Sequence, residues 1–176
     1  PYYWGEKPAF DKVEVAVIGD ANARALAFES GLINFMYGLE GQMSPDTFAR
    51  LQHYPDLSTA LSQPLSTRLI AMNSAQSATT SKLVRQAINH AIDRDGISQG
   101  IFYGTEIAAP FLFAPNVPYA DVGLSPYQYN LNTAAELLDS AGWLKIDGET
   151  YRQKDGESLR LELVYHGHDA NQKAVA

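Results

Sequence analysis

Apolar residues recur at helical spacing between Ser81 and Gly104, and this pattern is the clearest structural signal in the chain. Polar residues fill the opposite face, as in a helix that packs one side against a core. A second short helix, opened by Asp95, is predicted to follow at once and to end near Gly104. The apolar stripe of the first helix consists of Leu83, Val84, Ala87, Ile88, Ala91 and Ile92.

Capping signals predict four further helices, because Ser, Thr, Asp and Asn favour the N-cap and Gly favours the first position after the helix. Gly31 is predicted to end the first of these helices and Gly142 the third. Thr133 and Glu136 have the spacing of a capping box. In chain order, the predicted starts are Asp20, Ser44-Pro45, Thr133 and Asp169.

Alternation of apolar and polar positions predicts strands with one buried face, most clearly at Val13, Val15 and Val17. Asp155-Gly156 is the strongest short hairpin signal. The proline-containing stretch 108–130 is predicted to be irregular. Helices and strands alternate without a fixed repeat, so the expected fold class is mixed α/β (α+β). The predicted strands cover residues 13–18, 33–37, 57–61, 68–72 and 159–163.

Composition excludes several classes of protein. The 176 residues carry a formal net charge of −7 and no run of basic residues, which argues against a nucleic-acid partner. The absence of cysteine removes disulfides and thiolate chemistry. No apolar stretch reaches the ~18 residues that span a bilayer. The sequence also lacks a nucleotide-binding glycine loop, His-Glu-x-x-His and Gly-x-Ser-x-Gly.

The sequence contains one histidine pair with metal-ligand character, His166 and His168. Two imidazoles two positions apart on a strand point to the same face and could share a cation, with Asp169 beside them. Two histidines and one carboxylate make an incomplete ligand set, so a polar strand end before a helix cap is the favoured interpretation. His90 is expected to be a solvated helix residue, and His53 to lie near a helix end.

Tyr37, Gly38 and Glu40 are the candidate ligand-binding residues, in the stretch Tyr37-Gly38-Leu39-Glu40-Gly41. They directly follow a predicted strand. Open α/β sheets bind ligands beyond the carboxyl ends of their strands, and an aromatic side chain beside a carboxylate could line such a cleft. An ordinary strand-to-helix connection explains the same residues equally well.

Several motifs, in order along nearly the whole chain, resemble the large solute-binding proteins that serve ABC importers of peptides, nickel and related solutes. The stretch 37–41, together with residues 46–50 and 112–120, resembles the nickel-binding branch most closely. The motifs that carry the resemblance are Tyr3-Trp4-Gly5-x-Lys7-Pro8, Arg24-Ala25-x-Ala27-Phe28-Glu29-Ser30-Gly31-x-Ile33-Asn34, Val84-Arg85-Gln86-Ala87-Ile88-Asn89-His90-Ala91-Ile92-Asp93-Arg94 and Ala134-x-x-Leu137-Leu138-x-x-Ala141-Gly142-Trp143. Asn34 departs from the aspartate that is usual there.

The resemblance implies a type II periplasmic-binding-protein-like fold in which two α/β lobes, joined by hinge strands, close over a solute. Residues 1–63 would form the later part of the first lobe and residues 64–176 the earlier part of the second. The chain is then expected to be an internal piece of a longer protein, and to bind solute weakly on its own. Tyr37, Gly38 and Glu40 would lie near the cleft.

The implied function is capture of nickel, as a chelate, or of a peptide-like solute in the periplasm, and delivery to an ABC transporter permease. No reaction and no cofactor are expected; contact with the membrane would come only through the permease, and a monomer is expected. Two alternatives stay open from the residues alone. One is a hydrolase or transferase domain with an acidic cleft. The other is a passive interaction module that uses the aromatic residues between Phe102 and Phe113.

Overall fold

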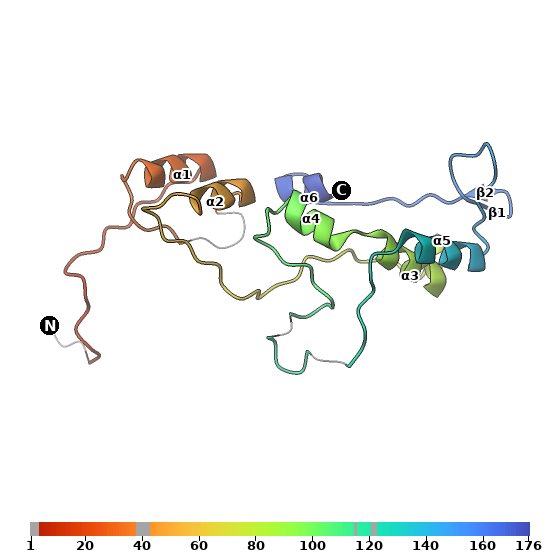
Figure 1. Ribbon diagram of the computed structural model, residues 1–176, viewed down its shortest axis with the longest axis horizontal. Helices are drawn as coiled ribbons and strands as arrows, with labels where there is room; N and C mark the ends of the chain where they lie inside the picture. The colour runs from red at the N-terminus through yellow and green to blue at the C-terminus, as the bar shows by residue number, and fades with distance from the viewer. Residues whose placement is uncertain (1–3, 38–42, 115, 121–122) are drawn as a thin grey trace. The chain divides into compact units, whose positions relative to one another are not determined.

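The computed structural model describes residues 4–37, 43–114, 116–120 and 123–176 (Figure 1). The chain divides into two compact units, Pro1–Leu57 and Ser58–Ala176, called here the N-terminal unit and the C-terminal unit. Among the described residues, regular structure consists mainly of helices, with one small sheet.

The N-terminal unit contains α1 (Ala21–Glu29) and α2 (Pro45–Leu51). Both predicted starts are confirmed. The Asp20 carboxylate accepts a hydrogen bond from the Ala23 backbone at 2.8 Å, and Pro45 occupies the first turn of α2, where its missing N–H costs nothing. Gly31, just past α1, has a φ of 73°, which a residue without a Cβ adopts freely.

The two helices of the N-terminal unit are joined by an ion pair between Glu29 on α1 and Arg50 on α2. The hydrogen bond from the Arg50 side chain to Glu29 raises the pKa of that guanidinium. The Arg50 side chain is half-exposed and that of Glu29 is 20% exposed, so solvent partly screens this pair. The apolar residues buried in the described part of this unit are Ala25, Ala27 and Leu51.

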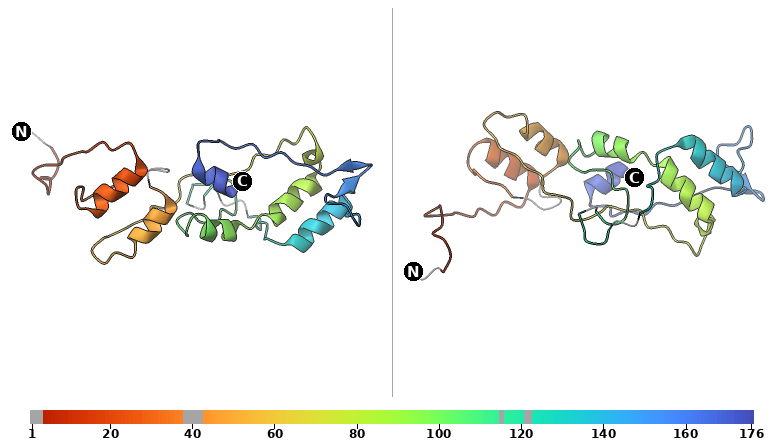
Figure 2. Two further views of the ribbon diagram at one scale, coloured as in Figure 1. Left: turned by 90° about the horizontal axis from the view of Figure 1, so that it is seen from above. Right: turned by 60° about the horizontal axis from the view of Figure 1, so that its bottom comes forward.

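The C-terminal unit is built around α3 (Lys82–Ala91) and α5 (Leu131–Ser140), which lie side by side in both views of Figure 2. The predicted apolar stripe supplies the buried side chains Val84 and Ala87, and α5 supplies Ala134. The short 3-10 helix η1 (Ala78–Thr80) packs at the start of α3. The predicted helix is therefore confirmed, and the centre of its apolar stripe is buried, but Ala91 is exposed and Ile92 lies just beyond the end of the helix.

The helix after α3, α4 (Arg94–Gly100), has its N-cap two residues earlier than predicted. Its N-cap is Asp93, whose carboxylate accepts a hydrogen bond from the Gly96 backbone at 2.8 Å. Asp95 instead lies in the first turn, where a negative charge interacts favourably with the helix dipole and stabilises the helix. The prediction that Asp95 opens this helix is therefore wrong, because two aspartates compete for one cap.

The N-cap of α5 is Asn130 and not Thr133, so the predicted capping box is also wrong. The Asn130 side-chain oxygen accepts hydrogen bonds from the backbone N–H groups of Asn132 at 3.0 Å and Thr133 at 3.1 Å. Thr133 is thereby the third helical residue. Gly142, with a φ of 85°, follows the helix as predicted.

Asn130→Ala is expected to destabilise the C-terminal unit by about 1 kcal/mol, because it leaves two N–H groups of the first turn of α5 without their acceptor. Asn130→Asp, which keeps the acceptor, is the matched control and should cost much less. Urea denaturation of the three proteins measures the difference. Equal stability of Asn130→Ala and the parent chain would contradict the capping role.

The predicted hairpin is confirmed as β1 (Gln153–Lys154) and β2 (Glu157–Ser158), paired antiparallel. Asp155 and Gly156 both have positive φ, 51° and 82°, as a type I′ turn requires. The predicted start at Asp169 is confirmed too, since Asp169 caps α6 (Ala170–Val175).

The predicted strands at 13–18, 33–37, 57–61, 68–72 and 159–163 are not strands in the described structure: these segments have no ladder partners. Val13, Val15 and Val17, the expected buried face, are 74%, 85% and 95% exposed. An alternating pattern specifies a face, but a strand also needs a neighbour to satisfy its backbone groups. In the described part of the chain, no helix has the length and apolar character needed to cross a bilayer.

Candidate functional site

The predicted ligand-binding residues are only partly visible in the structure. Tyr37 lies outside any helix or strand, and its side chain is 76% exposed, which leaves it accessible to a ligand. Gly38 and Glu40 lie outside the described residues. The assignment of these three residues to a ligand cleft therefore stays a prediction.

Two arginines in the motifs of the sequence have the same structural role, each folding the chain before a helix onto that helix. Arg24 on α1 and Arg85 on α3 each use one guanidinium nitrogen to donate to two consecutive backbone carbonyls upstream. The acceptors are Ile18 at 2.6 Å and Gly19 at 2.9 Å for Arg24, and Thr79 at 2.7 Å and Thr80 at 2.9 Å for Arg85. These arginines stabilise helix entries rather than line a site.

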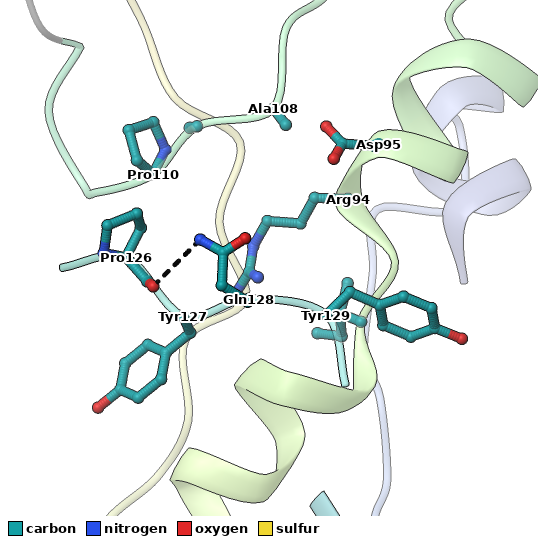
Figure 3. Close-up of a pocket in the computed structure, with 10 residues that line it drawn as sticks. Arg94, Asp95, Ala108, Pro110, Pro126, Tyr127, Gln128 and Tyr129 are labelled. Atoms are coloured by element: carbon teal, nitrogen blue, oxygen red, sulfur yellow. Dashed lines mark hydrogen bonds between the residues drawn. The ribbon is translucent and has the colours of Figure 1, made fainter. Parts of the chain in front are cut away.

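A hollow of about 150 Å³ lies in the C-terminal unit between α4 and the irregular stretch that precedes α5 (Figure 3). The Arg94 side chain extends into it toward Gln128 (Figure 3). Its guanidinium is already engaged, since it donates to the Asn89 backbone oxygen at 3.1 Å and side-chain oxygen at 2.8 Å. Ligand pockets are commonly about 300–1,000 Å³, so this hollow is too small to enclose a peptide or a metal chelate.

His90 links α3 to one wall of this hollow: it is a partly exposed helix residue, as predicted, but it also makes contacts that the prediction did not include. Its Nδ1 lies 2.6 Å from the Gln128 backbone oxygen, and its ring meets Tyr127 edge-on with centroids 5.2 Å apart. The Asn130 backbone N–H also donates to the His90 carbonyl at 2.8 Å. The end of α3 thereby positions the start of α5.

Arg68 joins three segments of the C-terminal unit that are far apart in the sequence. Its guanidinium forms a bidentate ion pair with Glu106, in which Nε and Nη2 donate to the two carboxylate oxygens at 2.8 and 3.1 Å. Its Nη1 lies 3.7 Å from Oδ2 of Asp169. It also stacks on the buried Phe102, 5.3 Å from the ring centroid. No local pattern signals this cluster, because Arg68 is 38 residues away from Glu106 in the sequence and still further from Asp169.

Asp169, the carboxylate next to the histidine pair, belongs to this cluster as well as to the α6 cap. Hydrogen bonds from the backbone of Gln172 and Asn171, with the charge of Arg68, hold its pKa below the ordinary value. The carboxylate is thus stabilised in its charged form by groups inside the protein.

The structure brings His166 and His168 together, with ring centroids 5.6 Å apart. They lie in a turn before α6 and not on a strand. Among residues 4–37, 43–114, 116–120 and 123–176, no group of three or more His, Cys, Asp or Glu side chains is placed to hold a metal ion. A closed metal site with a full protein ligand set is therefore not formed by these residues.

Comparison with known proteins identifies the family. All 176 residues match the sequence profile of the bacterial extracellular solute-binding proteins, family 5 Middle. The nickel-binding periplasmic protein of Escherichia coli K12 is 45% identical over 174 residues, which cover 99% of this chain and 33% of that protein. The oligopeptide-binding protein AppA of Bacillus subtilis is 27% identical, over 92% of this chain and 29% of that protein.

A solved structure extends the likeness to three dimensions. NikA from Brucella suis, crystallised in complex with Fe(III)-EDTA, matches with a TM-score of 0.89 and 49% identity, over 98% of this chain and 34% of that chain. The chain thus spans about a third of the length of the relatives it matches. The mixed fold is that of the type II periplasmic binding proteins. The chain belongs to the bacterial extracellular solute-binding proteins of family 5, represented here by its middle region.

Proposed function

We propose that the chain is part of the solute-binding component of an ABC importer, which captures nickel as a chelate in the periplasm and delivers it to a membrane permease without transforming it. The observation that carries this proposal is the 45% identity to a nickel-binding periplasmic protein along 99% of the chain. The likeness to the Fe(III)-EDTA complex of the Brucella protein favours a chelated metal as cargo.

A peptide is the second candidate cargo. The DppA protein of Helicobacter pylori, solved with the peptide STSA, is 33% identical over 80% of this chain, with a TM-score of 0.57. Both its identity and its structural likeness are lower than those of the Brucella NikA structure. Nickel is therefore the preferred proposal, and the peptide is the outcome against which it is tested.

Residues 1–63 are proposed to belong to the first lobe and residues 64–176 to the second, with Tyr37, Gly38 and Glu40 near the cleft between the lobes. The chain divides into two compact units between Leu57 and Ser58, six residues before the proposed boundary, and this division supports an assignment to two lobes. The exposure of Tyr37 supports its availability to a ligand.

The expected mechanism is a population shift between open and closed forms. A solute that contacts both lobes favours the closed form by its differential affinity for that form alone. The permease would then recognise the closed form. The proposed protein works as a monomer, and the net charge of −7 on this chain argues against a polyanion partner such as nucleic acid.

The test is a chimera in which this chain replaces the matching third of the Escherichia coli nickel-binding protein. The chimera is expected to bind Fe(III)-EDTA and not the peptide Ser-Thr-Ser-Ala, as measured by calorimetry. Saturation at 100 times the dissociation constant should stabilise it by about 2.7 kcal/mol. Tyr37→Ala and Glu40→Gln in the chimera should weaken chelate binding, because the proposal places both residues at the cleft.

Two controls make the result decisive. The 176-residue chain alone should show no tight binding of Fe(III)-EDTA, since a lobe-bridging ligand needs both complete lobes. A chimera that carries the matching segment of AppA reports how much of the affinity comes from the host protein. A folded chimera with this chain that binds the peptide but not the chelate would reject nickel, and one that binds neither would reject the proposed function.

A further inference from the structure

We propose that His166 and His168 form a two-imidazole binding site for a divalent transition-metal ion, of the class of Ni²⁺ and Cu²⁺, at the turn that leads into α6. This site would lie on the surface of the C-terminal unit, and metal binding there would not depend on closure of the lobes. It therefore goes beyond the proposed capture of a chelate.

The geometry of the two rings suits a shared metal ion. Their centroids lie 5.6 Å apart and their planes are inclined by 64°. A metal about 2.0–2.1 Å from one nitrogen of each ring, at the right-angled or tetrahedral angles that such ions prefer, places the centroids roughly 4.5–5.2 Å apart. The observed spacing is slightly wider, so a small rotation of the two exposed side chains would bring one nitrogen of each ring to a shared ion. Both side chains are exposed, and among the described residues neither imidazole nitrogen has a hydrogen-bond partner that would compete with a metal.

The turn that carries the rings is held in place by its own backbone. The Asp169 N–H donates to the His166 carbonyl at 3.0 Å. The His166 N–H donates to the side-chain oxygen of Gln172 on α6 at 2.9 Å. Because these bonds fix the backbone on both sides of Gly167, a metal ion needs to order only the two side chains. Gly167 itself leaves open space, since a Cβ there would meet nothing within 4 Å.

Asp169 is not the third ligand. One of its oxygens accepts hydrogen bonds from Asn171 at 2.9 Å and Gln172 at 3.1 Å, and the other faces Arg68. A metal bound by this carboxylate would have to break the α6 cap or the ion pair. The proposed site therefore has two protein ligands, and water fills the remaining positions.

Two neutral imidazoles set the metal preference and the strength of binding. Imidazole suits Ni²⁺, Cu²⁺ and Zn²⁺, whereas Mg²⁺ and Ca²⁺ take oxygen ligands. The order of affinity for nitrogen sites places Cu²⁺ above Ni²⁺. With only two ligands, binding of Ni²⁺ is expected to be weaker than micromolar. The acidic net charge of the chain, −7, favours approach of any cation.

The experiment titrates the 176-residue chain with NiCl₂ and CuCl₂ in a non-chelating buffer. His166→Ala and His168→Ala are each expected to weaken binding by about tenfold or more, because loss of one imidazole removes the chelate effect. The Cu²⁺ paramagnetic resonance spectrum should show coupling to two nitrogens in the parent chain and to one in each variant. His53→Ala, which removes a single exposed histidine from the N-terminal unit, is the matched control.

Two results would overturn the proposal. One is that His166→Ala and His168→Ala bind both ions as the parent chain does. The other is that His53→Ala lowers affinity and nitrogen coupling as much as they do. MgCl₂ should give no signal in any of the proteins. Because uncomplexed ions are used on the isolated chain, failure here leaves the chelate test of the proposed function untouched.

Discussion

Phe102→Ala is expected to destabilise the C-terminal unit by about 3–5 kcal/mol, the usual cost of removing a buried phenylalanine. The ring is 3% exposed, and the guanidinium of Arg68 lies over its face. Its loss leaves a cavity and removes the surface on which Arg68 is held against Glu106. The effect therefore combines lost burial with a loosened ion cluster.

Trp143 provides the measurement, because it is a buried tryptophan of the same unit, whereas Trp4 is 94% exposed. Urea denaturation followed by tryptophan fluorescence then reports mainly on the C-terminal unit. Phe113→Ala is the matched control, since that ring is 60% exposed and its removal should cost far less. A Phe102→Ala protein that unfolds at the same urea concentration as Phe113→Ala would show that the ring is not a core element.

The helices of this chain could be predicted from the sequence because their signals are local. The stripe around Val84 and Ala87 repeats every turn, and capping residues such as Asp20 and Asp169 act on groups two or three residues away. The failures at Asp95 and Thr133 arose where two capable residues stood close together. A pattern of residue types does not show which of two side chains reaches the first free N–H groups.

The strands were predicted less successfully, because a strand depends on a partner that is remote in sequence. The alternation at Val13, Val15 and Val17 is present in the sequence, yet these side chains are exposed in the structure. Only the Asp155-Gly156 hairpin, whose two strands are neighbours in sequence, forms a ladder from a predicted signal. The local alternation indicates pairing ability, and the rest of the sheet determines whether pairing occurs.

The side-chain clusters divide in the same way. The His166 and His168 pair could be found from the sequence because the two residues are separated by a single glycine. The sequence suggested that they lie on a strand, whereas the structure places them in a turn. The contacts of Arg68 and His90 with residues 38 positions away could not be found, since their geometry exists only after the helices pack. The ordered motifs identified the family, which the periodicity could not do, and the ligand cleft stays a prediction.

Leu51→Ala is expected to destabilise the N-terminal unit by about 2–5 kcal/mol, because Leu51 is 1% exposed and is the largest side chain buried in the described part of that unit. The other apolar residues buried there are alanines, so little else can compensate. The loss should appear as faster amide hydrogen exchange across α2, measured by mass spectrometry on fragments that cover residues 45–51. Leu26→Ala, at a leucine that is 65% exposed on α1, is the matched control and should leave exchange in α2 nearly unchanged. Equal exchange rates in the two variants would mean that Leu51 does not hold this unit together.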